Sequence, residues 1–83
     1  MKKILLDARE MEHPKPFEIS IKHLQTMKEN SYLYMLNQKV PTPLLDLAKE
    51  RGFNYVTKQD KKEDWHIIIS RNNVTNLEEL LDV

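Results

Sequence analysis

The chain has 83 residues, 40% of them hydrophobic and 31% charged, a composition typical of one small globular domain. Thirteen basic residues balance thirteen acidic ones, so net charge gives no attraction to nucleic acid or to an anionic membrane. The sequence has no cysteine, which excludes disulfides, thiolate metal sites and cysteine nucleophiles. The apolar run over residues 4–6 is too short for a signal peptide or a membrane span, and a cytoplasmic protein is expected.

A strand followed by a helix is predicted in the first third of the chain. Residues 3–7 alternate as a short strand, and a polar turn leads to Pro14 and Pro16. Proline is tolerated in the first helical turn, where its missing N–H has no partner to lose, so a helix is predicted over residues 14–28. His13 is then expected at or near the N-cap. The apolar side of this helix consists of Phe17, Ile21, Leu24 and Met27.

A second strand and helix follow, again with a start marked by prolines. Residues 32–37 alternate as a strand, and the helix is predicted over residues 43–51. Thr42 is the predicted N-cap, and Pro43 the first helical residue. Gly52 is expected to form the left-handed cap at the end of this helix.

The last third of the sequence predicts a β-hairpin and a short helix. Strands are expected over residues 53–57 and 65–70, and the short polar connection between them favours antiparallel pairing. Thr75 and Glu78 have the spacing of a capping box, which predicts a helix over residues 76–82.

The order strand, helix, strand, helix, strand, strand predicts an α+β fold. Right-handed crossovers place both long helices on one face of a four-stranded mixed sheet, which gives a two-layer α/β sandwich. Residues 1–72 are expected to form this domain, and residues 73–83 a short C-terminal helix or tail. The residues expected in the core between the layers are Ile4, Leu6, Phe17, Ile21, Leu24, Leu33, Met35, Leu44, Leu47, Phe53, Tyr55, Trp65, Ile67 and Ile69.

The sheet face away from the helices is predicted to carry an apolar patch. An apolar patch on a small protein usually contacts something. Either the helix over residues 76–82 covers it with Leu77, Leu80 and Leu81, or a second copy of the chain does so in a homodimer. The residues of the predicted patch are Leu5, Tyr32, Tyr34, Leu36, Val56 and Ile68.

Several motifs in register resemble a known group of proteins. A strand ending in Leu-Asp-Ala-Arg, followed by a Pro-x-Pro helix start, is similar to the TusA/SirA-like sulfur carriers. The chain resembles still more closely an uncharacterised TusA-related family, whose members occur alone or attached to hemerythrin-like domains. The motifs of that family read here as His13-Pro14, Asn37 with Pro41-Thr42-Pro43-Leu44, Gly52-Phe53-Asn54-Tyr55 and Trp65-His66-Ile67-Ile68-Ile69.

One position limits what the resemblance implies about chemistry. The sulfur carriers have Cys-Pro-x-Pro at this turn, whereas this chain has His13-Pro14-Lys15-Pro16. Imidazole cannot carry a persulfide, so the resemblance implies the fold and the location of a site but not sulfur transfer. No cofactor is expected.

Four residues are candidates for ligand binding. His13 lies at the predicted helix start, where unpaired N–H groups favour an anion. Arg9 and Lys39 follow the two parallel strands and Asn37 ends the second one, so all three are expected near the edge where His13 lies. The four residues are either a polar rim for a small anion or ordinary polar turn residues. The three histidines have no metal-ligand spacing.

Two functions are open at this point. The leading hypothesis is a non-catalytic domain that binds a protein partner or a small anionic ligand at the His13 end. The alternative is a metal- or haem-associated accessory module in redox or nitrogen-oxide metabolism, which rests on the proteins that related domains accompany. An enzyme acting alone ranks third, because the sequence shows no nucleophile–base arrangement.

Overall fold

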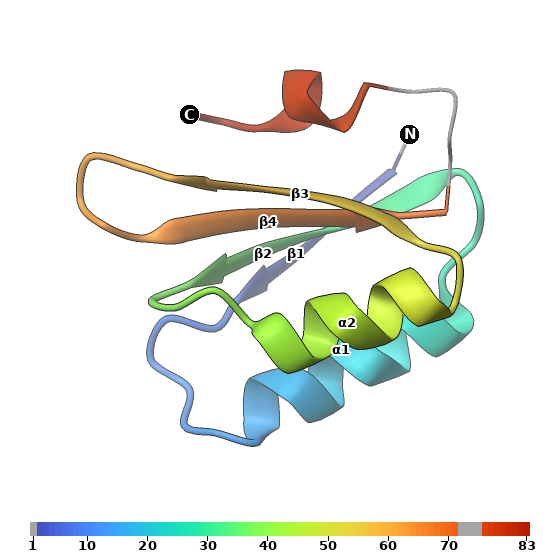
Figure 1. The fold of residues 1–83 in the computed structure, drawn as a ribbon, viewed down its shortest axis with the longest axis horizontal. Helices are drawn as coiled ribbons and strands as arrows, with labels where there is room; N and C mark the ends of the chain where they lie inside the picture. The colour runs from blue at the N-terminus through green and yellow to red at the C-terminus, as the bar shows by residue number, and fades with distance from the viewer. Residues whose placement is uncertain (1, 72–75) are drawn as a thin grey trace.

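The computed structural model of the protein describes residues 2–71 and 76–83. The element bounds are β1 Lys2–Asp7, α1 Lys15–Thr26, β2 Ser31–Asn37, α2 Thr42–Glu50, β3 Asn54–Gln59, β4 Trp65–Ser70 and the 3-10 helix η1 Leu77–Leu80. A four-stranded sheet of order β1-β2-β4-β3 lies on α1 and α2 (Figure 1). β1 is parallel to β2, and β4 is antiparallel to both of its neighbours. The predicted α+β class, element order and two-layer arrangement are confirmed.

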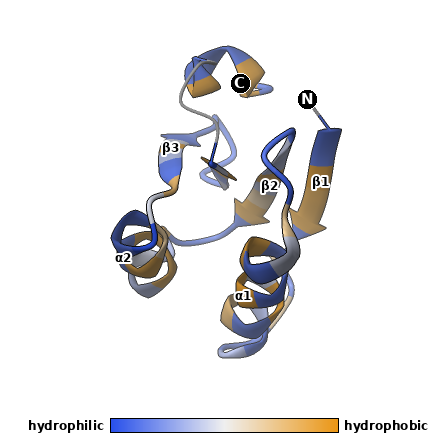
Figure 2. Ribbon diagram, turned by 90° about the vertical axis from the view of Figure 1, so that its right-hand side faces the viewer, coloured by the Kyte–Doolittle hydropathy of each residue, from blue (hydrophilic) through white to orange (hydrophobic). Residues whose placement is uncertain are grey.

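The main core lies between the two helices and the sheet. Figure 2 shows α1 and α2 side by side on one side of the strands. Because side chains alternate along β4, Ile67 and Ile69 are buried in this core, whereas Ile68 is buried on the opposite face, as predicted. The buried members of the main core are Leu6, Ala8, Leu24, Met27, Leu33, Met35, Leu44, Leu45, Ala48, Phe53, Ile67 and Ile69.

Two of the core predictions are wrong. Tyr55 is 37% exposed because it lies on β3 at the edge of the sheet, and the neighbouring Phe53 fills the core. On α2, Leu45 is buried while Leu47 is only half-buried. Helical spacing alone does not distinguish the two residues, since each has Leu44 and Ala48 as neighbours, and the packing of α2 on the sheet selects Leu45.

Both long helices start at a Pro-x-Pro turn, but without the predicted side-chain caps. The N-cap positions are Pro14 and Pro41, and neither makes a side-chain capping hydrogen bond. Because these prolines occupy the cap positions, His13 directly precedes the N-cap of α1, near the cap as predicted, whereas Thr42 is already the first helical residue of α2. The His13–Pro14 peptide bond is cis. Gly52 has a φ of +83°, which confirms the left-handed position predicted after α2.

Residues 76–83, here called the covering segment, pack on the sheet face opposite the helices (Figure 1). We call this surface the Tyr34 face; it consists of Tyr32, Tyr34, Leu36, Val56 and Ile68. Leu77 is buried against it, and Leu80 and Leu81 are half-buried. Coverage of this face by the end of the chain is therefore confirmed.

The covering segment differs in detail from the prediction. Its helical part is a single 3-10 turn, and the Asn76 side chain accepts a hydrogen bond from the N–H of Glu78 at its start. The predicted capping residue Thr75 lies outside the described residues. Leu5, expected in the patch, is 59% exposed, because β1 forms one edge of the sheet and η1 packs beside β3 at the other edge.

Candidate functional site

A pocket of about 380 Å³ lies where β1 and β2 end and α1 and α2 begin. We call it the helix-start pocket. The carboxyl ends of parallel strands meet at this edge, the usual place for ligands in open sheets with helical crossovers. The four residues predicted from the sequence, Arg9, His13, Asn37 and Lys39, all line it. The fold thus brings them together, and their role in binding stays a prediction.

The two helix starts lie at the wall of this pocket. Each start reads Pro-x-Pro followed by an apolar residue, Phe17 in α1 and Leu44 in α2, and both residues line the pocket. Within residues 2–71 and 76–83, the N–H groups of Phe17 and Leu44 donate to no main-chain carbonyl. A helix N-terminus carries about half a positive charge, so two of them at one cavity favour an anionic group.

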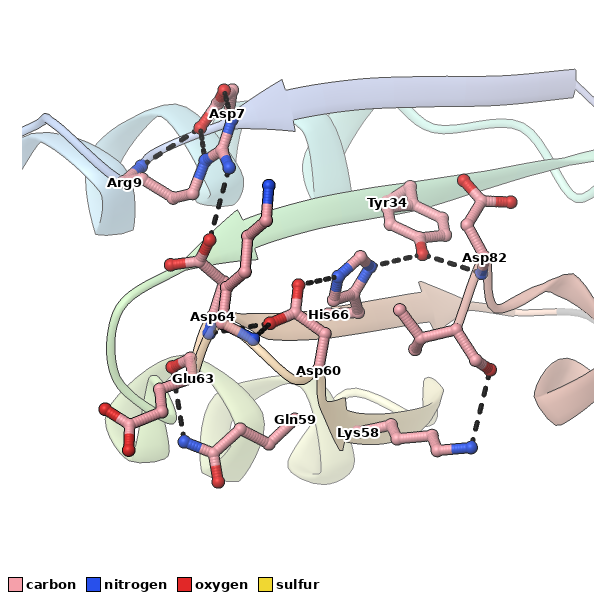
Figure 3. A network of polar contacts seen from close by, with 12 residues as sticks. Asp7, Arg9, Tyr34, Lys58, Gln59, Asp60, Glu63, Asp64, His66 and Asp82 are labelled. Carbon is pink, nitrogen blue, oxygen red and sulfur yellow. Dashed lines mark hydrogen bonds and ion pairs between the residues drawn. The ribbon is translucent and has the colours of Figure 1, made fainter.

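The positive charge of Arg9 is compensated by two carboxylates (Figure 3). Its Nε and Nη2 donate to the two oxygens of Asp7 at 2.9 and 2.7 Å, and its Nη1 donates to Asp64 at 3.2 Å. These hydrogen bonds raise the pKa of Arg9, and the Arg9 contact lowers the pKa of the Asp7 carboxyl. Arg9 therefore ties the end of β1 to the turn before β4 and offers a ligand less net charge than the sequence indicates.

Lys39, Asn37 and His13 form the remaining polar part of the pocket. Asn37 is half-buried, and its Nδ2 donates to the carbonyl of Lys39 at 3.0 Å, which fixes the turn between β2 and α2. Lys39 and His13 are both exposed to solvent. In the part of the chain that the structure describes, Lys39 makes no ion pair, so its ammonium group is free to meet an anion.

The wall of the pocket is largely apolar. Phe17, Met35 and Leu44, which the sequence assigns to the core, also line the cavity at its edge. Met11 and Val40 contribute from the two turns, and sequence reasoning missed both. The one signal that could have found them is the repeated Pro-x-Pro start, because each repeat brings its preceding turn to the same edge of the sheet.

A second cavity of about 510 Å³ lies next to the first and has the opposite electrostatic character. Arg9 and Gln38 line both cavities. The other lining residues of the second cavity are acidic: Asp7, Glu10 and Asp64. Among the described residues, Arg9 is the one cation in its lining. An anionic group is therefore favoured on the side of the helix starts and disfavoured on this side.

Comparison with known proteins places the chain in a family. Residues 5–71 match the family described as "Uncharacterized conserved protein (DUF2249)". The chain belongs to the DUF2249 family. No curated protein and no solved structure matches the chain. The matched region of this DUF2249 protein contains the whole helix-start pocket, whereas the covering segment lies beyond it. No helix among the described residues of the DUF2249 protein is long and apolar enough to cross a membrane.

The DUF2249 protein has a second polar arrangement on the Tyr34 face (Figure 3). Tyr34 is 1% exposed, and its hydroxyl lies 2.6 Å from Nδ1 of His66. Nε2 of His66 lies 2.9 Å from Oδ2 of Asp60. The other oxygen of Asp60 accepts hydrogen bonds from the N–H groups of Lys62 and Asp64, which closes the turn between β3 and β4.

Burial and hydrogen bonding shift two ionisable groups of this arrangement. Burial raises the pKa of the Tyr34 phenol, and the His66 hydrogen bond lowers the pKa of the Asp60 carboxyl. The sequence places His66 and Tyr34 on the same sheet face, and the antiparallel register makes them diagonal neighbours, since Leu36 pairs with His66. Sequence reasoning missed Asp60, because its approach to His66 depends on the conformation of the turn.

Proposed function

We propose that this DUF2249 domain is a non-catalytic binding module that holds a small ligand in the helix-start pocket. The ligand would have an apolar body and one anionic group. The observation that carries the proposal is the convergence of two helix N-termini on one largely apolar cavity, each with an N–H that donates to no main-chain carbonyl of the described residues. The volume of about 380 Å³ lies within the range of roughly 300–1,000 Å³ that small-molecule sites occupy.

The charges around the cavity support an anion at one defined side. The Lys39 ammonium and the N–H groups of Phe17 and Leu44 favour negative charge there. The carboxylates of the neighbouring cavity repel it from the other side. The apolar body of the ligand would then lie against Phe17 and Met35, where burial of its surface contributes to affinity.

We further propose that the domain is related to the TusA/SirA-like carriers by fold. The β-α-β-α-β-β order and the Pro-x-Pro start of α1 directly after β1 and its turn support this relationship. His13 stands where those carriers have cysteine, so persulfide transfer is not part of the proposed function.

Thermal stabilisation by three matched small molecules tests the binding proposal. Hexanoate joins an anionic head to an apolar chain, hexanamide keeps the chain without the charge, and acetate keeps the charge without the chain. A ligand that binds only the native state raises the melting temperature, so hexanoate should raise it more than either control. Stabilisation of equal size by all three molecules would contradict the proposal.

Two lysine variants locate the effect. Lys39→Met removes the charge at the pocket while keeping the length of the side chain, and it should reduce the advantage of hexanoate over hexanamide, of which the two helix starts retain a part. Lys49→Met removes an exposed charge in the last turn of α2, away from the pocket, and should leave that advantage unchanged. Equal losses in both variants would show that the selectivity comes from overall charge and not from the pocket.

The metal- or haem-associated alternative has less support from the side chains. Across the described residues, no three or more histidine, aspartate or glutamate side chains are grouped so that they could hold a metal ion. This finding counts against a metal ion held by three or more side chains of the described residues. Elemental analysis and the visible absorption spectrum of protein purified from native extract test this alternative, which a stoichiometric metal or a haem band would favour.

A further inference from the structure

The Tyr34 face is shaped to receive a segment with three leucines. Leu77, Leu80 and Leu81 have the i, i+3, i+4 spacing that places side chains on one side of a helical turn. They pack on Tyr34 and Ile68 in an apolar cluster separate from the helix–sheet core. The segment that closes this cluster lies outside the region that matches the family.

Polar groups of the same face contact the acidic residue that follows the leucines. The N–H of Asp82 donates to the Tyr34 hydroxyl at 2.9 Å, and the Asp82 carboxylate lies 2.9 Å from the Lys3 ammonium. The Lys3 ammonium also lies 4.2 Å from the centre of the Tyr34 ring. Lys58 donates to the carbonyl of Val83 at 3.4 Å. The face thus combines apolar contacts with two cations and one side-chain hydroxyl that accepts from a main-chain N–H.

The sheet itself, and not the covering segment, orients the Tyr34 hydroxyl. Because the Asp82 N–H donates to the hydroxyl oxygen, the hydroxyl hydrogen is free to donate to Nδ1 of His66. Nε2–H of His66 then donates to the Asp60 carboxylate. The Tyr34 hydroxyl and both ring nitrogens of His66 thus all have hydrogen-bond partners. The acceptor is therefore built into β2, β4 and their turn before any segment docks.

The covering segment, by contrast, is held by weak contacts. The side chains of the Lys3–Asp82 pair are 37% and 63% exposed, and exposed ion pairs contribute little to stability. The helical part of the segment is a single 3-10 turn of four residues, and two of its three leucines are only half-buried. A segment of the same chemistry on another protein would make the same contacts.

We propose that the Tyr34 face is a docking surface for a Leu-x-x-Leu-Leu-Asp segment of a partner protein, and that residues 76–83 occupy it as an intramolecular competitor. The ion pair between Lys3 and the acidic residue that follows the leucines selects the partner, and the Lys58 hydrogen bond to the next main-chain carbonyl adds to it. The tethered copy lowers the apparent affinity for the partner by keeping the face occupied.

Binding of a labelled peptide to the full-length protein tests the proposal. The peptide has the sequence of residues 76–83, and a control peptide has its three leucines replaced by serine. In the protein, Leu77→Ser with Leu80→Ser weakens the covering segment and leaves the face intact, whereas Glu79→Gln changes an exposed position of the same segment. We expect the doubly substituted protein to bind the peptide at least ~10-fold more tightly than wild type or Glu79→Gln, because the tethered competitor is weakened.

Two further variants keep the test decisive. If the double variant does not fold, Leu80→Ala is the milder change at a half-buried position, and the same order of affinities is expected. Adding Tyr34→Phe to the doubly substituted protein should reduce peptide affinity by about fivefold, the effect of one lost hydrogen bond. Equal binding of the serine peptide, or no binding at the ~mM concentrations that a short tether supplies, would overturn the proposal. Self-association of the doubly substituted protein before peptide is added would also overturn it, by showing that a second copy of the chain occupies the Tyr34 face.

Discussion

Tyr34→Phe is the substitution whose effect on stability follows most directly from the structure. It removes one oxygen atom from a side chain that is 1% exposed and keeps the aromatic ring. The lost hydroxyl contacts Nδ1 of His66 at 2.6 Å and the N–H of Asp82 at 2.9 Å. Both groups lose a partner in the variant, but they do not have the same access to water.

The magnitude depends on which of the two groups water can reach. Asp82 is exposed, so water can replace the lost acceptor, and losing it costs less free energy than leaving a buried atom without a partner. His66 is buried, and a buried polar atom without a partner costs about 1–3 kcal/mol. We therefore expect Tyr34→Phe to lower the free energy of unfolding by about 1–3 kcal/mol, a substantial part of the roughly 5–15 kcal/mol typical of small domains.

Urea unfolding followed by circular dichroism measures this difference. Tyr55→Phe is the matched control, because Tyr55 is 37% exposed on an edge strand, and it should stay within about 0.5 kcal/mol of wild type. Combining Tyr34→Phe with His66→Phe should show a coupling energy of about 0.5–3 kcal/mol, as expected for residues in direct contact. If the two tyrosine variants lose equal stability, or the double variant is additive, the hydrogen-bonded arrangement is not what stabilises this face.

Three further predictions concern other parts of the molecule. The Ser20 hydroxyl is buried and has no hydrogen-bond partner among the described residues, so Ser20→Ala should raise the free energy of unfolding by about 1 kcal/mol in urea titrations. The pKa of Asp60 is lowered in the folded state, so its carboxylate stabilises the fold at pH values above the pKa it has in the unfolded chain. This contribution to the free energy of unfolding should be lost as the pH falls below about 4, and Asp60→Asn should make the loss of stability with falling pH smaller. His13→Cys should give a thiol whose pKa lies below the free value of ~8.5, because it precedes a helix start; a value at or above this in an iodoacetamide rate titration would count against that placement.

The fold and the location of the pocket follow from the sequence because both rest on local rules. Proline at the first helical turn marks the starts of α1 and α2, and alternation along β2 and β4 assigns each side chain to a face. Two right-handed crossovers then bring the ends of β1 and β2 to one edge. Arg9, His13, Asn37 and Lys39 lie together for this reason, without any long-range contact having to be known.

The features that sequence reasoning missed depend on contacts between distant parts of the chain. Alternation tells which face a residue occupies but not whether its strand lies at an edge. For this reason the burial predicted for Tyr55 is wrong, and Leu5 of the predicted patch lies outside the part that the covering segment buries. The pairing of Arg9 with Asp64 joins residues that are 55 positions apart. The approach of Asp60 to His66 depends on the backbone of a turn, for which the sequence contains no comparable rule.

The central claim is that an anionic group binds at the paired helix starts, and amide-proton NMR during a hexanoate titration tests it most directly. The account predicts that the largest shifts occur at the N–H groups of Phe17 and Leu44 and at the side-chain amide of Asn37, since all three residues line the pocket. Hexanamide should move these signals much less, because its neutral carbonyl accepts weaker hydrogen bonds than a carboxylate does. Saturable shifts confined to the covering segment, or no difference between the two compounds at Phe17 and Leu44, would contradict it.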